Sequence, residues 1–282
     1  MSATDTVPRE TYFKTADDIR LRELAWETDG DARAAVVIVH GFGHHAACFQ
    51  DVAAHLNTHG FNCHALDLRG HGKSEGRRGH VASYERTFDD VRLFLGRVRE
   101  RSAATPFVLF GHSMGALIAA LLAAEDQMEL RGLILSSGLL RIPDHVSPLL
   151  LALAGVLGRL FPYLPVQPVD LGTLSRDPAY LERMRADSLR YIGRMNARSG
   201  LEMMKAMTRL DGCMERISVP LLVLHGTADR LTDPEGSRVL HTRAASADKT
   251  LRLFDGGYHE LFNDYGKEEY LSVITEWLVA RS

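Results

Sequence analysis

Cysteine is scarce in this chain of 282 residues, which has only Cys48, Cys63 and Cys213. Three cysteines so far apart exclude a disulfide framework and favour a reducing compartment. The first residues, 1–14, also lack the apolar core of a signal peptide. We therefore expect a cytoplasmic protein, and contact with a membrane surface is a further hypothesis that rests on an apolar segment described below.

No charge of one sign dominates, because 33 Lys and Arg residues stand against 36 Asp and Glu residues, for a net charge of −3. This balance gives no basic surface for nucleic acid, so we expect no nucleic-acid partner. The longest apolar stretch, 149–164, is interrupted by Gly155, Gly158, Arg159 and Pro162 and is too short to span a bilayer. What the chain does have is 45% hydrophobic residues, enough for one large domain with a buried core.

Short apolar runs typical of strands alternate with helical segments along most of the chain. We expect an N-terminal antiparallel hairpin (12–13 with 19–26), strands at 35–39, 62–68, 107–110, 133–136, 219–225 and 250–254, and helices at 52–59, 87–101, 116–125, 235–244 and 267–280. Such alternation predicts an α/β protein with a mostly parallel central sheet and helices on both faces.

The interval 139–213 breaks this alternation. It contains an apolar helical segment, three closely spaced prolines (162, 165 and 168) and two polar helical stretches at 178–186 and 200–210. We expect residues 1–138 and 214–282 to form the core, and 139–213 to form a helical cap inserted before the strand 219–225. Such an insertion is best placed over a site at the carboxyl ends of the strands.

The most informative motif is Gly111-His112-Ser113-Met114-Gly115. It follows the apolar run 107–110 and precedes the small-residue helical run 116–124, so the serine lies at the tip of a sharp strand-to-helix turn. This pattern is typical of a nucleophile elbow, in which glycines two residues to either side of the serine allow the chain to turn closely. Ser113 is therefore the candidate nucleophile.

A serine needs a base to take its proton and a carboxylate to orient that base. Asp229 follows one expected strand directly, and His259 follows the last expected strand in a glycine-rich loop. The chain order Ser113, Asp229, His259 is that of α/β-hydrolases. Asp233 is an alternative carboxylate, with Asp229 then capping the next helix, but Asp229 is favoured because it lies closer to the strand end.

An oxyanion hole needs two backbone N–H donors near the reacting carbonyl. Met114 supplies one by its position after the serine, and Phe42, in the loop His40-Gly41-Phe42-Gly43, is the candidate for the other. His40 with His44 and His45 would also suit a metal, but zinc needs at least three protein ligands and we expect no further cysteine or carboxylate at this run. We therefore predict that His40 hydrogen-bonds within its loop, and that the protein uses no metal and no cofactor.

The apolar segment of the predicted cap has leucines at helical spacing. They are Leu149, Leu153, Leu157, Leu160 and Leu164, widened by Leu150, Val156 and Phe161. One interpretation is that this helix packs on the rim of the core; the other is that part of it lines an acyl tunnel or rests on a lipid surface, because large exposed apolar patches mark contact sites. Leu149, Leu150, Leu153 and Leu157 are the candidate substrate contacts of this lid.

Besides the elbow, several segments of the chain resemble the monoacylglycerol lipase (lysophospholipase-like) family of the α/β-hydrolase superfamily. These are His40-Gly41-Phe42-Gly43-His44-His45, the Asp67–Val81 run with its Arg-Gly-His-Gly and Gly-Arg-Arg-Gly-His-Val parts, the His225-Gly226-Thr227-Ala228-Asp229-Arg230 run with Pro234-Glu235-Gly236-Ser237, and Gly257-Tyr258-His259-Glu260-Leu261-Phe262-Asn263. The resemblance covers nearly the whole length. It implies an α/β-hydrolase fold and a serine hydrolase that cleaves monoacylglycerols to fatty acid and glycerol through an acyl-enzyme.

The resemblance also implies a small lipid ester as substrate and a lid whose apolar outer face meets a membrane or micelle. The chain departs from the family at 44–49, His-His-Ala-Ala-Cys-Phe, where the family shows Glu-His-Ser followed by Arg-Tyr; in the family this part lines the acyl or alcohol pocket. It closes the elbow with Gly115-Ala116 where a third glycine is common. A lysophospholipase or general carboxylesterase with the same triad is the alternative, and a non-catalytic receptor for an apolar ligand would have no need of Asp229.

Overall fold

The computed structural model describes residues 7–102, 106–125, 130–142, 148–168 and 170–282, and of 148–152 only the backbone. The strands are β1 (Arg9–Lys14), β2 (Arg20–Trp26), β3 (Ala34–Val39), β4 (Phe61–Leu66), β5 (Phe107–His112), β6 (Gly132–Ser136), β7 (Pro165–Gln167), β8 (Met195–Asn196), β9 (Leu221–Gly226) and β10 (Lys249–Phe254). The α-helices are α1 (Gln50–Thr58), α2 (Tyr84–Arg101), α3 (Met114–Glu125), α4 (Pro148–Leu160), α5 (Pro178–Ala186), α6 (Ala197–Asp211), α7 (Pro234–Arg243) and α8 (Lys267–Val279). Short 3-10 turns lie at Ala46–Phe49, Leu171–Thr173, Met214–Arg216 and Leu261–Asn263.

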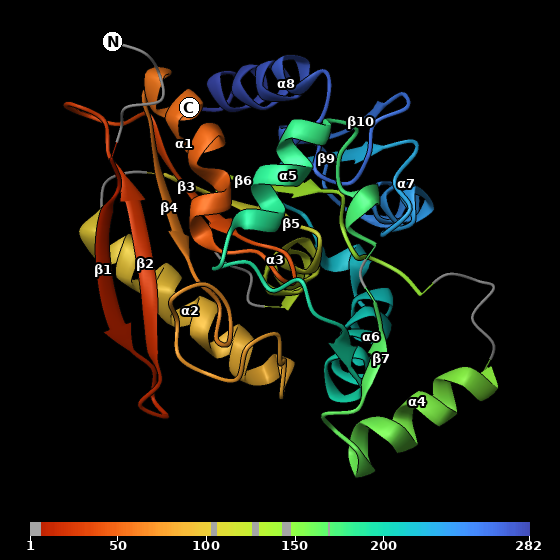
Figure 1. Cartoon of the computed structure of the whole chain (residues 1–282). Helices are drawn as coiled ribbons and strands as arrows, with labels where there is room; N and C mark the ends of the chain where they lie inside the picture. The colour runs from red at the N-terminus through yellow and green to blue at the C-terminus, as the bar shows by residue number, and fades with distance from the viewer. Residues whose placement is uncertain (1–6, 103–105, 126–129, 143–147, 169) are drawn as a thin grey trace.

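A single sheet organises the described part of the chain (Figure 1). Eight strands pair in the order β1-β2-β4-β3-β5-β6-β9-β10. The β1–β2 and β2–β4 pairs are antiparallel, and all pairs from β4 to β10 are parallel. The predicted hairpin and parallel sheet are therefore confirmed, and the carboxyl ends of β3, β5, β9 and β10 lie at the same edge of the sheet.

Helices cover both faces of this sheet, as the alternation predicts. Alternate residues of β3 belong to different buried clusters: Val37 lies with residues of α2, α3 and α6, whereas Val36 lies with residues of α1 and α8. Because successive side chains of a strand point to opposite faces, these clusters are the two sides of the core. Helix α3 is buried along Met114–Ala124, which explains why its sequence is apolar and small on all sides.

The segment between β6 and β9 adds α4, β7, α5, β8 and α6 to the sheet core. Helix α6 packs on α3 and on α4, and its residues Met203 and Leu210 belong to the main core cluster. Gly158 sets the close approach of α4 to α6, because a Cβ there would lie 2.7 Å from Leu201 Cβ. Among the helices of the described residues we find no candidate for a membrane span.

Two details of this segment differ from the sequence prediction. The leucine stripe to Leu164 predicts a longer helix, but α4 ends at Leu160, two residues before Pro162. Pro165 then begins β7, which pairs with β8 in a two-stranded antiparallel sheet that the sequence analysis did not predict. A proline has no N–H to continue a helix and restricts the residue before it to extended backbone, so Pro162 and Pro165 favour this outcome.

Both edges of the large sheet carry charged side chains. In β1, at one edge, Arg9, Glu10 and Lys14 are exposed, and in β10, at the other edge, Arg252 is exposed. Charged residues are a common way in which natural edge strands avoid pairing with another chain.

Candidate active site

Ser113 lies at the turn between β5 and α3 with a φ of 55°, in the left-handed region that residues with side chains rarely adopt. The two flanking glycines make this turn possible. A Cβ on Gly111 would lie 2.4 Å from the carbonyl oxygen of Gly115, and a Cβ on Gly115 would lie 2.0 Å from the carbonyl oxygen of Val39. The predicted elbow therefore forms, with the backbone of α3 pressed against β3.

Substituting Gly115 with alanine should destabilise the fold strongly, because the atom it meets is backbone and cannot rotate away. We expect a loss of about 3 kcal/mol in the free energy of unfolding, at the upper end of what overpacking costs. Urea unfolding measures this loss. Gly155→Ala in α4 is the matched control, since its nearest neighbour lies 3.9 Å away and alanine favours a helix. Equal stability of the Gly115→Ala variant and the wild type would contradict the packing described here.

His259 and Asp229 form a buried pair in the loops that follow β10 and β9. Nδ1 of His259 lies 2.7 Å from Oδ2 of Asp229, and both side chains are almost fully buried. The Leu231 N–H donates to Oδ1 of Asp229 at 2.8 Å, and the Thr232 hydroxyl donates to Oδ2 at 2.8 Å. Nε2 of His225 also lies 3.2 Å from Oδ2. Several donors thus fix the carboxylate in one orientation.

Asp233, the alternative carboxylate, has a different position. It is the N-cap of α7, where its side chain accepts a hydrogen bond from the Glu235 N–H at 2.9 Å. This is the usual role of an aspartate at a helix start. Of the two candidates it is therefore Asp229 whose carboxylate contacts His259.

Each member of the pair shifts the pKa of the other toward its charged form. Burial alone would lower the pKa of His259, but the charge of Asp229 and the hydrogen bond to it outweigh burial, so the pKa is raised above its ordinary value. Burial also acts against ionisation of Asp229, but the charge of His259 and hydrogen bonds from His225 and His259 bring the pKa of Asp229 well below its usual range. Asp229 is therefore ionised at neutral pH, and Nδ1 of His259 is the nitrogen that faces it. With the ring hydrogen of neutral His259 on Nδ1, Nε2 is the nitrogen that can accept a proton.

The serine and the His–Asp pair lie at one edge of the sheet. Ser113 follows β5, and Asp229 and His259 follow β9 and β10, which are parallel to it. His112, the residue before the serine, has its ring centre 4.9 Å from that of His259. Burial lowers the pKa of His112 well below the ordinary value, so the ring beside His259 is neutral.

The predicted oxyanion loop follows β3 and lies against the elbow. A Cβ on Gly41 would lie only 3.0 Å from Cβ of Ser113, so the next residue, Phe42, has its backbone beside the serine. Met114 flanks the serine on the other side along the chain. Both predicted donors are thus close to Ser113, and their role in holding an oxyanion stays a prediction.

Hydrogen bonds from a second loop hold the oxyanion loop in place. Nδ1 of His40 lies 2.7 Å from the carbonyl oxygen of Gly41, as predicted for a histidine that bonds within its loop, and its Nε2 accepts from the Leu68 N–H at 2.9 Å. Asp67 accepts from the Ala46 N–H at 2.6 Å. The Asp-Leu-Arg-Gly-His-Gly run that contributes to the family resemblance therefore braces this loop, a role that the sequence analysis did not assign.

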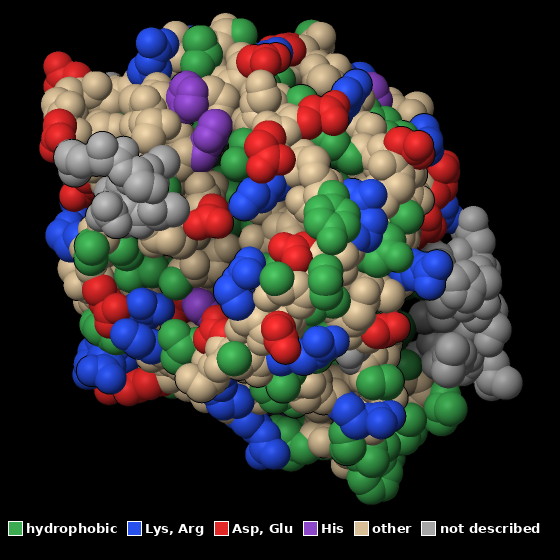
Figure 2. Space-filling view, turned by 45° about the horizontal axis from the view of Figure 1, so that its top comes forward, with side chains coloured by type: hydrophobic (Ala, Val, Ile, Leu, Met, Phe, Trp, Pro, Cys, Tyr) green, Lys and Arg blue, Asp and Glu red, His purple; other side chains and the backbone are tan. Residues whose placement is uncertain are grey.

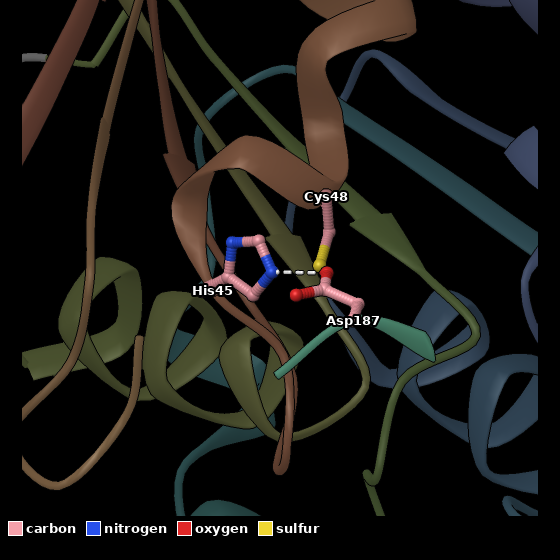
Figure 3. A group of neighbouring side chains, drawn as sticks. All are labelled: His45, Cys48 and Asp187. Atoms are coloured by element: carbon pink, nitrogen blue, oxygen red, sulfur yellow. Dashed lines mark hydrogen bonds and ion pairs between the residues drawn. The ribbon is translucent and has the colours of Figure 1, made fainter. Parts of the chain in front are cut away.

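The structure corrects the expectation that no further cysteine or carboxylate would join the histidines of this run. Cys48 and Asp187 lie beside His45, and one ligand atom from each falls within 4.8 Å of the others (Figure 3). However, Nε2 of His45 lies 2.7 Å from Oδ2 of Asp187, and burial raises the pKa of the Cys48 thiol to about 12. A metal would have to separate the His–Asp contact and ionise a thiol that burial keeps protonated, so the group fits a hydrogen bond better than a metal site.

Glu260, the residue after His259, is a further site residue that the sequence analysis named only as part of a motif. Its carboxylate is fully buried, and His44 contacts it through Nε2 at 2.9 Å. Nη1 of Arg190 donates to it at 2.9 Å, the Asn263 side chain donates at 2.9 Å, and the Tyr180 hydroxyl is also bonded to it. In the sequence, Glu260 is recognisable only as a charged residue next to His259. Nothing in the sequence indicates which residues contact its carboxylate.

The predicted lid residues divide into described and undescribed positions. Leu149 and Leu150 belong to α4, but their side chains lie outside the described residues. Leu153 is 50% exposed, and Leu157 is half-buried. The side of α4 that carries Leu153 therefore faces away from the core, and contact of these leucines with substrate stays a prediction.

A serine at a left-handed elbow, a buried His–Asp pair after the last two strands, and this strand order define an α/β-hydrolase. Comparison with known proteins agrees. The model of the Hydrolase_4 family, described as serine aminopeptidase, S33, matches residues 30–266, and the chain belongs to this family.

Several relatives of the chain are named as lipases. It is 34% identical over 271 residues to the monoacylglycerol lipase of Mycolicibacterium smegmatis, covering 96% of this chain and 97% of the relative. It is 32% identical over 240 residues to human monoglyceride lipase, covering 85% of this chain and 79% of the relative. The crystal structure of the Paleococcus ferrophilus monoacylglycerol lipase matches with a TM-score of 0.80 at 34% identity, covering 98% of this chain and 100% of that one.

Proposed function

We propose that this protein is a serine ester hydrolase that cleaves monoacylglycerols into fatty acid and glycerol. The observation that carries the proposal is a strained serine at the same sheet edge as a buried histidine that contacts an ionised aspartate, in a chain similar over nearly its whole length to enzymes named monoacylglycerol lipases. Ser113, His259 and Asp229 are the proposed catalytic residues.

In the proposed acylation, Nε2 of His259 removes the proton of Ser113 while Oγ attacks the ester carbonyl carbon. Asp229 stabilises the imidazolium that forms, because its carboxylate is already 2.7 Å from Nδ1. The N–H groups of Phe42 and Met114 hold the negative oxygen of the tetrahedral intermediate. The intermediate collapses with cleavage of the ester C–O bond, and His259 gives its proton to the departing glycerol oxygen.

In the proposed deacylation, the same groups act on water. His259 takes a proton from a water molecule, whose oxygen attacks the acyl carbon of the acyl-enzyme. The second tetrahedral intermediate breaks the bond to Oγ of Ser113, which regains a proton from His259 as the fatty acid leaves. Each step requires His259 neutral at its start.

The test is release of glycerol and fatty acid from monoacylglycerols of short to long chains, beside di- and triacylglycerols and lysophosphatidylcholine. Turnover confined to monoacylglycerols is the expected result. Turnover of lysophosphatidylcholine alone would replace the proposal with a lysophospholipase, and turnover only of short or aryl esters would replace it with a general carboxylesterase. No ester turnover, with an apolar ligand still bound, would indicate a receptor on this fold.

We also propose that residues 139–213 form a cap over the site and that 1–138 and 214–282 form the core. Contacts from this segment support the assignment, because Asp187 bonds to His45 and Arg190 bonds to Glu260. Since α6 shares the main core cluster, the cap is packed into the core at its C-terminal end. Movement of the cap would then be confined to the part before α6.

The outer side of α4 and the chain that follows it is the proposed contact with a lipid surface. Figure 2 shows hydrophobic side chains gathered at the lower edge of the molecule, over the end where α4 lies in Figure 1. Leu153, Val156, Leu160 and Phe161 are 50%, 49%, 68% and 58% exposed. Apolar side chains so exposed and so close along the chain are typical of contact sites.

Replacing Leu153, Leu160 and Phe161 together with serine should weaken binding to phosphatidylcholine vesicles at least tenfold. Each large apolar side chain that enters lipid contributes on the order of 1 kcal/mol or more. Co-sedimentation with vesicles measures the loss, and Leu93→Ser is the control because Leu93 is an exposed leucine of α2, 40% exposed, away from this surface. Unchanged vesicle binding by the triple variant would rule out this surface as the lipid contact.

A further inference from the structure

A single carboxylate links the three parts of the structure that surround the proposed catalytic residues. Glu260 follows His259 in the loop after β10. Its partner His44 belongs to the loop after β3 that carries Phe42, and its partner Arg190 follows α5 in the segment between β6 and β9. Arg190 donates with Nη1 at 2.9 Å and Nη2 at 3.2 Å, so both guanidinium nitrogens contact the carboxylate.

The chain around Arg190 is also tied to the oxyanion loop. At its start, Asp187 contacts His45 as described above, and at its end the Tyr191 N–H donates to the carbonyl oxygen of Gly43 at 2.9 Å. The Tyr191 ring meets the Phe42 ring edge-on, with centres 5.8 Å apart. We call the segment 187–191 the strap, because both of its ends bond to the oxyanion loop: Asp187 to His45 and Tyr191 to Gly43.

Packing alone does not explain this arrangement. Arg190 and Glu260 are only 8% and 0% exposed, and taking two such charges out of water costs about as much as their attraction returns. A buried ion pair is therefore a weak source of stability, but it imposes one geometry, since removing either partner leaves an uncompensated charge. What this geometry fixes is the backbone next to His259 and the loop next to Ser113.

We propose that Arg190 is a positioning residue, which acts through Glu260 and the strap to hold the loop of His259 and the oxyanion loop in their reactive arrangement. The inference rests on the proposed ester hydrolysis. The segment between β6 and β9 would then be part of the catalytic apparatus as well as a cover, because the site reaches its geometry only with the strap in place. Tyr180, His44 and Asn263 are the other donors to the Glu260 carboxylate.

The network also adjusts the charge around the base. His259 is faced by Asp229 from the loop after β9, by Glu260 next to it, by His112 from β5 and by His44 from the oxyanion loop. The charge of Glu260 raises the pKa of His259, and Arg190 offsets that charge. Loss of Arg190 should therefore move the acid limb of kcat/KM to higher pH, and loss of Glu260 should move it to lower pH.

The test compares Arg190→Met, Glu260→Met and the double variant with the wild type. The matched control is Arg185→Met, which removes an exposed arginine of α5. For each, kcat, KM and the pH profile are measured with a water-soluble short-chain monoacylglycerol, stability by urea unfolding, and reactivity of Ser113 by the rate of labelling with a fluorophosphonate. The labelling rate does not depend on ester turnover.

For Arg190→Met we expect kcat and the labelling rate to fall 10- to 100-fold, with KM changed less than threefold and the acid limb shifted. The double variant should recover most of the unfolding free energy, because no buried charge is left unpaired, while kcat stays at least tenfold low. A double variant that regains both stability and kcat would overturn the proposal, as would full kcat and labelling in Arg190→Met. If the wild type hydrolyses no ester, the proposed function fails, and the labelling rates still decide the role of Arg190.

Discussion

Replacing Ser113 with alanine is expected to lower kcat for monoacylglycerol hydrolysis by roughly 10⁴-fold or more. Without Oγ no acyl-enzyme can form, and only the oxyanion donors and substrate binding remain to accelerate attack by water. The serine contributes little to stability, because alanine keeps the backbone and removes one oxygen. Urea unfolding should therefore show a variant close to the wild type, and glycerol release should show almost no turnover.

Ser137→Ala is the matched control for this experiment. Ser137 also has a left-handed backbone, with a φ of 46°, and it follows β6 at the same edge of the sheet as the elbow. We expect Ser137→Ala to retain most of the activity. Comparable losses in both variants would mean that the substitutions act through the backbone of this edge, and Ser113 would no longer be the proposed nucleophile.

Replacing Asp229 with asparagine is expected to lower kcat by about 10⁴-fold while preserving the shape of the site. The carboxylate accepts a hydrogen bond from Nδ1 of His259 at 2.7 Å, which leaves Nε2 as the proton acceptor. An amide can present its NH₂ group to Nδ1 instead, which moves the ring hydrogen to Nε2 and removes the base. Loss of the charge also lowers the pKa of His259, so the acid limb of the remaining activity should lie at lower pH.

Asp233→Asn separates this effect from a general loss of acidic side chains in the same loop. Asparagine caps a helix about as well as aspartate, so α7 should begin as before and kcat should stay within about twofold. If Asp233→Asn were the variant that lost activity and Asp229→Asn retained it, the carboxylate of the proposed triad would have been assigned to the wrong residue.

The sheet and the positions of Ser113, Asp229 and His259 could be predicted because each depends on local sequence. Strands of a parallel sheet are buried on both faces and are therefore continuous apolar runs in the sequence. For this reason β3, β5, β6 and β9 can be recognised without knowing which strands they pair with. The elbow glycines are required by the turn itself. Residues that directly follow such strands necessarily meet at one edge, which is why three positions distant in sequence could be placed together.

The small sheet of β7 and β8 and the network around Glu260 could not be predicted for the opposite reason. Strands β7 and β8 have three and two residues, and only their pairing with each other makes them strands. Arg190 lies 70 residues before Glu260 and belongs to no periodic pattern. Neither residue spacing nor composition indicates a buried ion pair between such distant positions. The pair forms only because the fold buries both side chains next to each other.

The charged edges of the large sheet bear on how copies of this protein meet. The proposed lipid contact would concentrate the protein at a surface, and open strand edges at high local concentration favour aggregation by intermolecular β-pairing. Exposed charges on β1 and β10 oppose growth of the sheet from one copy into the next. Self-association of this chain would therefore be directed away from the sheet, toward the exposed apolar side chains of α4, and it would compete there with the proposed lipid contact.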